Sequence, residues 1–236
     1  MGMQNKLNGY FCGWYFKLQS EDVTVALIPA FHRTRKGNFC TLQFISNDLV
    51  QVAEFPYEAL KLRKRPLSID IGGNTFSEKG IHLDVDKEGL SLKGEISFGP
   101  WSPLRGGDIM GPFAMVPFMQ CRHGVLSTSH SADGWIDING RRYSFAGARG
   151  YIEGDRGYSF PSVYLWTQCL FDDGSLMLSV ADIPMGLFHF TGIIGFVHHS
   201  GKQWRIATYK GRQSHCNQGW RLHYPPGRYC VHSKAT

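Results

Sequence analysis

Apolar and polar residues alternate along much of this chain, and a period of two is typical of β-strands that bury one face. Residues 10–18 have aromatic side chains at both odd and even positions, and residues 23–28 form an expected strand, rich in β-branched residues, that ends at Pro29. Phe39–Ser46 alternates throughout. Further short strands, with Gly-containing loops typical of hairpins between them, are expected at residues 67–71, 75–77, 81–85 and 90–98. The first half of the chain therefore predicts an antiparallel meander.

Two segments depart from this alternation. Ala53–Arg63 has apolar residues at helical spacing, but Pro56 lies inside it, so at most one helical turn is expected there. Residues 101–119 are rich in Pro and Gly, and they contain the apolar run Ile109–Met119. Since loops normally lie in water, this run is predicted to cover something apolar, either a barrel mouth or a seam between domains.

A second series of alternating segments follows the Pro-rich stretch. Strands are expected near residues 121–129, 135–138, 143–146, 163–171, 176–183, 189–198 and 204–209. Each series alone is short of a full core, so the pattern predicts an all-β protein with little helix, in which two antiparallel β-barrels or half-barrels pack together. The expected domains are residues 1–120, an incomplete second β-domain at residues 121–211, and an atypical basic tail at residues 212–236.

The composition supports a folded protein of this kind. Of 236 residues, 42% are hydrophobic and 14% aromatic, which is enough to fill a core, and only 19% are charged. No apolar run reaches the roughly 18–20 residues that span a bilayer, and no apolar signal segment follows the first residues. We therefore expect a cytoplasmic protein with no transmembrane segment, while peripheral contact with a membrane stays open.

The net charge of +6 is concentrated at the C-terminal end. No acidic residue follows Asp182, whereas seven Lys and Arg residues do, so residues 1–182 carry a net charge of −1. Proteins that read nucleic acid usually spread basic residues over a face of the fold, and no nucleic-acid partner is expected here. The dense basic run Lys61–Arg65 precedes Pro66 and is interpreted as a solvated turn rather than a targeting signal.

Cysteine and histidine positions do not indicate a metal site. The six cysteines are scattered, with no CxxC pair and no secretion signal, so a disulfide framework is disfavoured. Cys121 and His123, with His130 and His198 further along, lack the spacing of common zinc sites. The phosphate-binding and nucleophile-elbow motifs of common enzymes are also missing. We expect neither a metal nor a cofactor.

Three runs of residues carry a family resemblance. They are Tyr10–Lys17, Met119–Val125 leading to His130, and Tyr151–Pro161 leading to Trp166-Thr167-Gln168. Together they resemble the tocopherol cyclase family, over roughly residues 9–211 in order. The most specific motif is the acidic-x-acidic-x-Gly-x-x-Phe-Pro segment. The resemblance implies a lipocalin-like double β-barrel akin to that of carotenoid hydratase relatives, and a cyclase or isomerase activity.

The chain departs from the family pattern at several positions. Cys12 and Gln120 stand where the family usually has Glu, so two carboxylates are missing. Gly154 and Arg156 replace the Lys and Trp of the plant cyclases, which implies a different branch whose substrate need not be a tocopherol precursor. After residue 211 the resemblance is expected to stop, since residues 212–236 lack alternation.

The resemblance also implies a chemistry for the shared residues. Cyclising a prenylated quinol requires a proton for the alkene, stabilisation of the tertiary cation and exclusion of water. Glu153 and Asp155 are the expected proton donors, because a carboxyl group in an apolar cavity can keep its proton near neutral pH. His130 is the third expected catalytic residue. The expected substrate-binding residues are Trp14, Tyr15, Phe160, Tyr164, Trp166, Gln168 and Arg156.

The acidic motif has a catalytic and a structural interpretation. In the first, Glu153, Asp155 and Arg156 line or brace the mouth of a largely apolar cavity bordered by the apolar run of the Pro-rich loop. In the second, the same three residues form a salt-bridged turn. Gly154 and Gly157 favour a loop over a strand at this position.

The remaining site residues and the activity itself also have alternatives. Trp14 and Trp166 suit core packing as well as cation stabilisation, and His123 and His130 suit hydrogen-bonded structural roles as well as proton transfer. The alternative to a cyclase is a lipocalin-like binder of a hydrophobic ligand without turnover, which the two missing carboxylates favour.

Overall fold

The computed structural model describes residues 9–116, 119–185 and 188–210. Strands hold 70% of these residues and short 3-10 helices 5%, with no α-helix among them. The prediction of an all-β protein with little helix is therefore confirmed. The predicted basic tail at residues 212–236 lies outside the described residues. No helix in the described part of the chain is long and apolar enough to cross a membrane.

Contacts between residues group the chain into two units. Of the described residues, the first unit takes in 9–108 and 119–160, and the second takes in 109–116, 161–185 and 188–210. This division by contacts differs from the predicted boundary near residue 120, which stays a prediction about folding domains.

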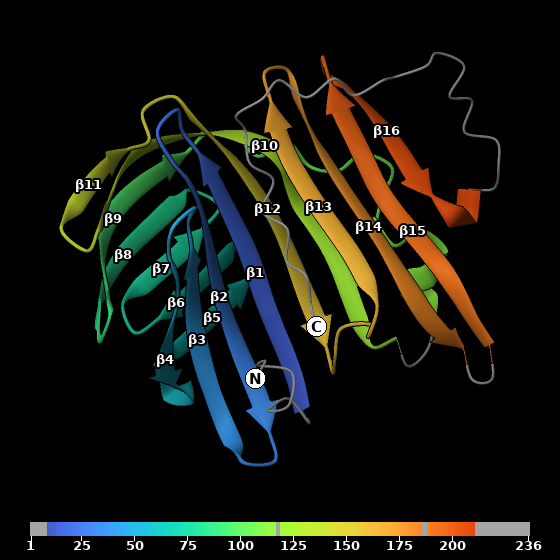
Figure 1. The fold of residues 1–236 in the computed structure, drawn as a ribbon, viewed down its shortest axis with the longest axis horizontal. Coiled ribbons are helices and arrows are strands. Elements are labelled where there is room, and N and C mark those ends of the chain that lie inside the picture. Colours follow the sequence, from blue (N-terminus) through green and yellow to red (C-terminus); the bar gives the residue numbers. More distant parts are fainter. Residues whose placement is uncertain (1–8, 117–118, 186–187, 211–236) are drawn as a thin grey trace. The chain divides into compact units, whose positions relative to one another are not determined.

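The first unit is one antiparallel sheet of twelve strands. Its elements are β1 (Gly9–Gln19), β2 (Thr24–Thr34), β3 (Gly37–Ile45), β4 (Val50–Pro56), η2 (Tyr57–Ala59), β5 (Leu60–Lys64), β6 (Leu67–Ile71), β7 (Asn74–Ser77), β8 (Gly80–Lys87), β9 (Leu90–Phe98), β10 (Cys121–Ile138), β11 (Arg141–Ser144) and β12 (Ala148–Gly157). Their order is β4-β3-β2-β1-β12-β10-β9-β8-β7-β6-β5, with β11 paired to β10 (Figure 1).

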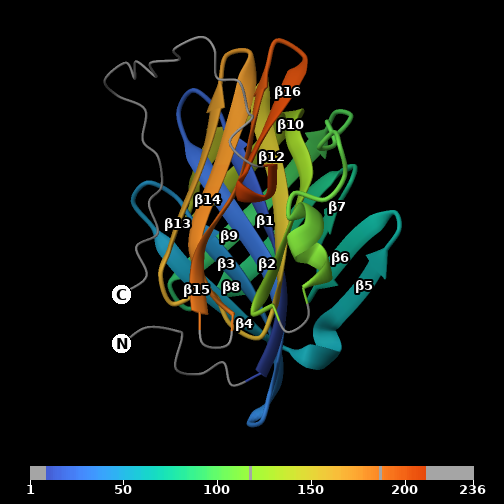
Figure 2. The ribbon, with the colours of Figure 1, turned by 90° about the vertical axis from the view of Figure 1, so that its right-hand side faces the viewer.

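The two border strands of this sheet are joined by very few residues. β4 and β5 lie at opposite ends of the strand order, yet only the three residues of η2 connect them. The sheet therefore has to curl until its two ends approach each other, as barrel formation requires. Figure 2 shows β5 at the right of the view. The basic run Lys61–Arg65 lies mainly on this edge strand rather than in a turn, and charged edge strands resist pairing with another chain.

One face of the curled sheet forms a continuous apolar core. Phe16, Phe44 and Phe76 have no exposed surface, and the ring centroid of Phe16 lies 5.2 Å from that of Phe76. Ile152 of β12 belongs to the same core. Because side chains alternate across a strand, the neighbours of Ile152 along β12 point to the opposite face of the sheet.

Two strands run further than the alternation predicts. β2 continues through Pro29 to Thr34, whereas the sequence pattern ends it at Pro29. The ladder between β1 and β2 has a gap at Pro29, so the missing N–H of the proline costs no strand pairing there. β10 joins the strands predicted at residues 121–129 and 135–138 into one strand of 18 residues, with shifts of register that accommodate its length.

The second unit contains a four-stranded antiparallel sheet in the order β13-β14-β15-β16. Its elements are η3 (Gly111–Met115), β13 (Tyr164–Phe171), β14 (Gly174–Met185), β15 (Phe188–His199), β16 (Lys202–Ala207) and η4 (Thr208–Lys210). Each strand is paired with the next along the chain, as the predicted meander requires.

Residues 109–116 of the apolar run pack within this second unit. Ile109 and Met110 are buried. The ring of Phe113 lies 5.4 Å from that of Phe190 and 5.5 Å from that of Tyr209, measured between centroids. The hydroxyl of Tyr209 donates to the Ile109 carbonyl oxygen at 3.3 Å. The loop therefore has an apolar packing role, while its place at the border of a cavity stays a prediction.

Candidate functional site

A row of polar side chains lies on the face of β12 that points away from the core. Tyr151, Glu153 and Asp155 are spaced by two along this strand, which places them on one face. β12 runs between β1 and β10. Tyr15 of β1 is paired with Glu153, and His123 of β10 is paired with Asp155. Side chains of directly paired residues share a face, so three strands contribute to the row.

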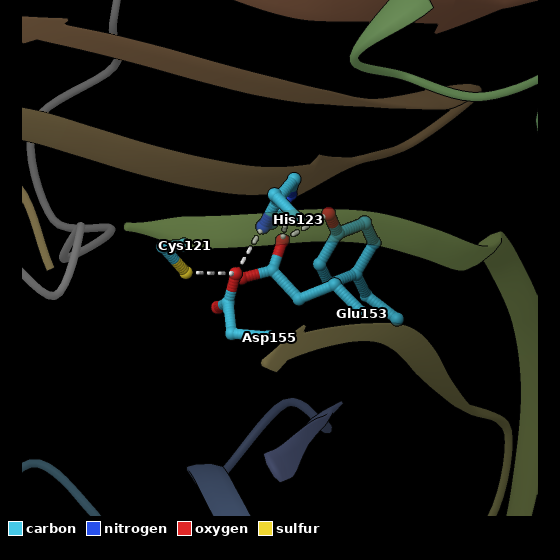
Figure 3. Close-up of polar contacts among 5 residues, drawn as sticks. Cys121, His123, Glu153 and Asp155 are labelled. Carbon is cyan, nitrogen blue, oxygen red and sulfur yellow. Dashed lines mark hydrogen bonds and ion pairs between the residues drawn. The ribbon is translucent and has the colours of Figure 1, made fainter. Parts of the chain in front are cut away.

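Within this row, His123 is held between two carboxylates (Figure 3). Its Nδ1 lies 2.9 Å from Oδ1 of Asp155, and its Nε2 lies 3.3 Å from Oε2 of Glu153. The same Oε2 accepts a hydrogen bond of 2.5 Å from the hydroxyl of Tyr151, and the thiol of Cys121 donates to Asp155 at 3.6 Å. We call these five residues the His123 cluster. A carboxylate oxygen lies within ion-pair distance of each ring nitrogen, which favours the protonated form of His123.

The pKa of His123 reflects two opposing effects. Burial by itself would lower it, because burial removes water from the charged ring. The negative charges of Glu153 and Asp155, and their hydrogen bonds to the ring, act in the opposite direction. The carboxylates prevail, and the pKa of His123 lies well above its ordinary value.

Burial keeps the neighbouring groups protonated. It raises the pKa of Tyr151 well above the ordinary value, with a further contribution from the charge of Glu153, and the same two causes raise the pKa of Tyr15. Burial, followed by the charge of Asp155, also raises the pKa of the Cys121 thiol. These three groups therefore keep their protons near neutral pH and do not act as bases.

The stabilising contribution of His123 is expected to depend on pH. Because folding raises its pKa above the ordinary 6.5, the contribution is complete below that pH and is lost as the pH rises through the raised value. The measurement is the difference in unfolding free energy between wild type and His123→Gln, from urea denaturation at several pH values between roughly 6 and 9. We expect the difference to shrink as pH rises, and a constant or growing difference would contradict the ion pairs.

The three charged members of the cluster differ in access to solvent. The side chain of Asp155 is 24% exposed, that of His123 11% and that of Glu153 4%. Asp155 is therefore the member best placed to touch a bound molecule. Glu153 is placed to hold His123 from the buried side.

The same residues could hold a metal ion only at the expense of these contacts. One donor atom each from His123, Glu153 and Asp155 lies within 4.8 Å of the others. A histidine that binds a metal must present a deprotonated nitrogen, but both ring nitrogens of His123 face carboxylates. The arrangement therefore suits a shared proton better than a metal ion.

His130, which the sequence analysis names as catalytic, lies apart from this cluster. It is paired with Gly150, its ring is edge-on to Phe98 at 4.6 Å, and its Nδ1 lies 2.9 Å from Oγ of Ser127. Burial lowers the pKa of His130 to about 4, so the ring is neutral near pH 7. The histidine that lies beside Glu153 and Asp155 is His123.

The predicted aromatic residues of the first unit lie on different faces. Trp14 belongs to the apolar core, in agreement with its structural alternative. Tyr15, the next residue, points to the opposite face and is paired with Glu153. The ring of Phe160 packs against that of Phe11 in a tilted arrangement, with 4.9 Å between ring centroids. Substrate binding by these residues stays a prediction.

The predicted binding residues of the second unit share one face of β13. Tyr164, Trp166 and Gln168 are spaced by two along the strand. Gln168 is buried, and the other two side chains are half-buried. Their contribution to substrate binding likewise stays a prediction.

The acidic motif forms a strand, so the predicted loop or salt-bridged turn is wrong. Gly157 is needed because a Cβ at this position would lie 2.0 Å from the carbonyl oxygen of Gln120, and the glycine reflects this close approach rather than a loop. Arg156 is exposed and points to the face opposite Asp155, which excludes the predicted salt bridge between these neighbours. Arg156 as a substrate-binding residue stays a prediction.

Comparison with known proteins finds a family whose sequence pattern matches part of this chain. Residues 107–223 match the family model described as tocopherol cyclase-like. Over this segment the chain is similar to the tocopherol cyclase-like family. The matched segment contains all five residues of the His123 cluster. It also extends past residue 211, so the expectation that the family resemblance stops there is wrong.

Two curated relatives match this chain in part. One is a probable tocopherol cyclase, chloroplastic, of Oryza sativa subsp. japonica, which is 32% identical over 44% of this chain and 24% of the relative. The other is a tocopherol cyclase, chloroplastic, of Zea mays, which is 29% identical over 44% of this chain and 23% of the relative. The match thus spans about a quarter of the length of these relatives.

Solved structures share the fold at low sequence identity. CghA with Sch210972 superposes with a TM-score of 0.57 and 9% identity, covering 83% of this chain and 59% of that one. Kievitone hydratase from Nectria haematococca superposes with a TM-score of 0.52 and 9% identity, covering 86% of this chain and 65% of that one. These similarities confirm the predicted lipocalin-like fold of this chain.

Proposed function

We propose that this protein catalyses a cofactor-independent cyclisation or isomerisation of a prenylated quinol or another hydrophobic polyene, with the His123 cluster as its proton-transfer site. One observation carries the proposal: a buried histidine is held by two carboxylates of the adjacent strand. Such a group stores a proton at neutral pH and offers acceptors for its transfer. The names of the rice and maize relatives support the same reaction class.

The proposed reaction takes up one proton and returns one. His123 passes its Nδ1 proton to the contacting oxygen of Asp155, and Asp155 delivers it to one carbon of the substrate alkene. The other alkene carbon becomes a tertiary cation, which the quinol oxygen attacks to form the new C–O bond. The quinol proton then returns to the cluster. The product is an isomer of the substrate, and the step needs neither an oxidant nor a reductant.

The departures from the family pattern do not remove a member of this cluster. Cys12 is paired with Arg156, on the face opposite His123. Burial raises the pKa of the Cys12 thiol to about 11, so this residue stays uncharged where the family has a carboxylate. Gln120 lies just before β10, and its carbonyl oxygen accepts the backbone N–H of Tyr158. The proton-transfer group is therefore complete without either carboxylate.

The test is conversion of a prenylated hydroquinone in light and heavy water. We expect a product of unchanged mass and new retention time in H₂O, because the reaction is an isomerisation. In D₂O the product should gain one carbon-bound deuterium, because the proton given to the alkene comes from the exchangeable cluster. Chromatography coupled to mass spectrometry measures both. Recovery of bound but unaltered hydroquinone would overturn the proposal in favour of a non-catalytic binder of hydrophobic ligands.

Removal of metal ions provides a separate prediction. We expect conversion to be unchanged after dialysis against EDTA, because the proposed steps use only the side chains of the His123 cluster. The measurement compares initial rates before and after dialysis, with buffer-dialysed protein as control. A loss of activity that added zinc restores would show that the three donor groups hold a metal and not a proton.

A further inference from the structure

Tyr151 contacts the carboxylate oxygen of Glu153 that faces His123. Its hydroxyl donates to Oε2 of Glu153 at 2.5 Å, and this oxygen also lies 3.3 Å from Nε2 of His123. The side chain of Tyr151 is fully buried. Tyr151 and Glu153 are two residues apart on β12, so the strand itself fixes the pair on one face.

The direction of this hydrogen bond restricts where a proton can be. A phenol that donates to Oε2 stabilises the carboxylate form of Glu153, since a charged acceptor forms a stronger bond than a neutral one. A proton on Oε2 would compete for the site that the Tyr151 hydroxyl already uses. The pair of Glu153 and His123 can share one proton in two ways, and the hydrogen bond favours the arrangement in which the ring carries it.

The other groups that face His123 are compatible with this arrangement. Asp155 of β12 contacts Nδ1, and Cys121 of β10 donates to the same Asp155 oxygen. On β1, Tyr15 is paired with Glu153, and the buried Lys17 is paired with Tyr151. Glu153 and Asp155 place negative charge against the ring, and Tyr151 donates to Glu153.

We propose that Tyr151 is a positioning residue that holds Glu153 as a carboxylate and thereby keeps the mobile proton on the ring of His123. This inference rests on the proposed function, because it concerns the same proton. In this scheme the hydroxyl of Tyr151 donates to Glu153 and takes no part in the transfer to the substrate. It acts through Glu153.

The test compares wild type with Tyr151→Phe by NMR of protein labelled at histidine with ¹⁵N. The ring nitrogen shifts distinguish imidazolium from neutral imidazole, and loss of the His123 signals in His123→Gln assigns them. We expect His123 to be imidazolium in the wild type near neutral pH. In Tyr151→Phe the ratio of imidazolium to neutral His123 should fall about tenfold or more. In the conversion assay kcat should fall about tenfold, with KM within about twofold.

A matched control variant and the melting temperature separate this positioning role from simple stabilisation of the fold. Tyr57→Phe also removes a hydroxyl with hydrogen-bond partners, here the two guanidinium contacts from Arg33, and it should leave the His123 signals unchanged. If Tyr151→Phe lowers only the melting temperature and leaves the His123 nitrogen shifts as in wild type, the positioning role is overturned. If His123 is neutral in the wild type, the proposed function itself fails. The NMR comparison requires no substrate, so the two failures are distinguishable.

Discussion

Asp155→Asn is expected to reduce conversion at least about a hundredfold while leaving the fold intact. Asp155 is the most exposed charged member of the His123 cluster and accepts from the ring Nδ1 at 2.9 Å. An amide keeps the size of the side chain but cannot pass a proton from the ring to an alkene, and general acid catalysis contributes about 10²–10⁴ in rate. Initial rates at saturating prenylated hydroquinone, together with thermal melting, measure both properties.

Two further variants make this result specific. Asp84→Asn makes the same chemical change on the exposed face of β8, and it should alter neither rate nor melting temperature. Glu153→Gln should lower both, because Glu153 is buried and contacts Tyr151 and His123. If Asp155→Asn keeps its rate, or if its rate only follows the fraction of folded protein, Asp155 has a structural role and the proposed proton route is wrong.

Phe16→Ala is expected to lower the free energy of unfolding by about 3–5 kcal/mol. Phe16 has no exposed surface, and its ring lies 5.2 Å from that of Phe76 and 6.4 Å from that of Phe98. Truncation removes apolar contacts and leaves a cavity that a closely packed core fills only in part. The midpoint and slope of urea unfolding measure the loss.

The control for this variant is a residue of similar chemistry that is not packed. Val50 of β4 is 61% exposed, so Val50→Ala should change the unfolding free energy by less than about 0.5 kcal/mol. Because Phe16 lies on the core face, conversion per folded molecule should survive Phe16→Ala. A cost below about 1 kcal/mol would mean that this interior is not the closely packed core described above.

The strands were predictable because alternation along the chain is a local property. Phe39–Ser46 and residues 90–98 follow the period of two and lie in β3 and β9 with at most small shifts of the ends. The same local pattern predicts a loop for the motif around Gly154 and Gly157, which is wrong. Its glycines reflect contacts with other strands, such as the approach of Gly157 to Gln120, and these contacts cannot be read from the sequence.

The site was predictable in its carboxylates but not in its histidine. Glu153 and Asp155 stand out as an acidic pair in an apolar motif, and the spacing of two puts them on one face once the segment is a strand. Choosing His123 over His130 requires the register between β10 and β12, which contains two irregularities between these histidines. Alternation within Cys121-Arg122-His123 was the available signal, and it gives the face without giving the partner.

The two faces of β12 have different roles, and this difference determines which positions can be mutated without disturbing the core. Ile152 serves the apolar core, whereas Tyr151, Glu153 and Asp155 serve the polar row. Directed libraries at Tyr15, Glu153 and Asp155 would therefore sample new reactivity and substrate range while the core residues on the opposite face of these strands stay native. In random mutagenesis, by contrast, about half of the substitutions in these strands would fall on core-facing positions and disturb the packing.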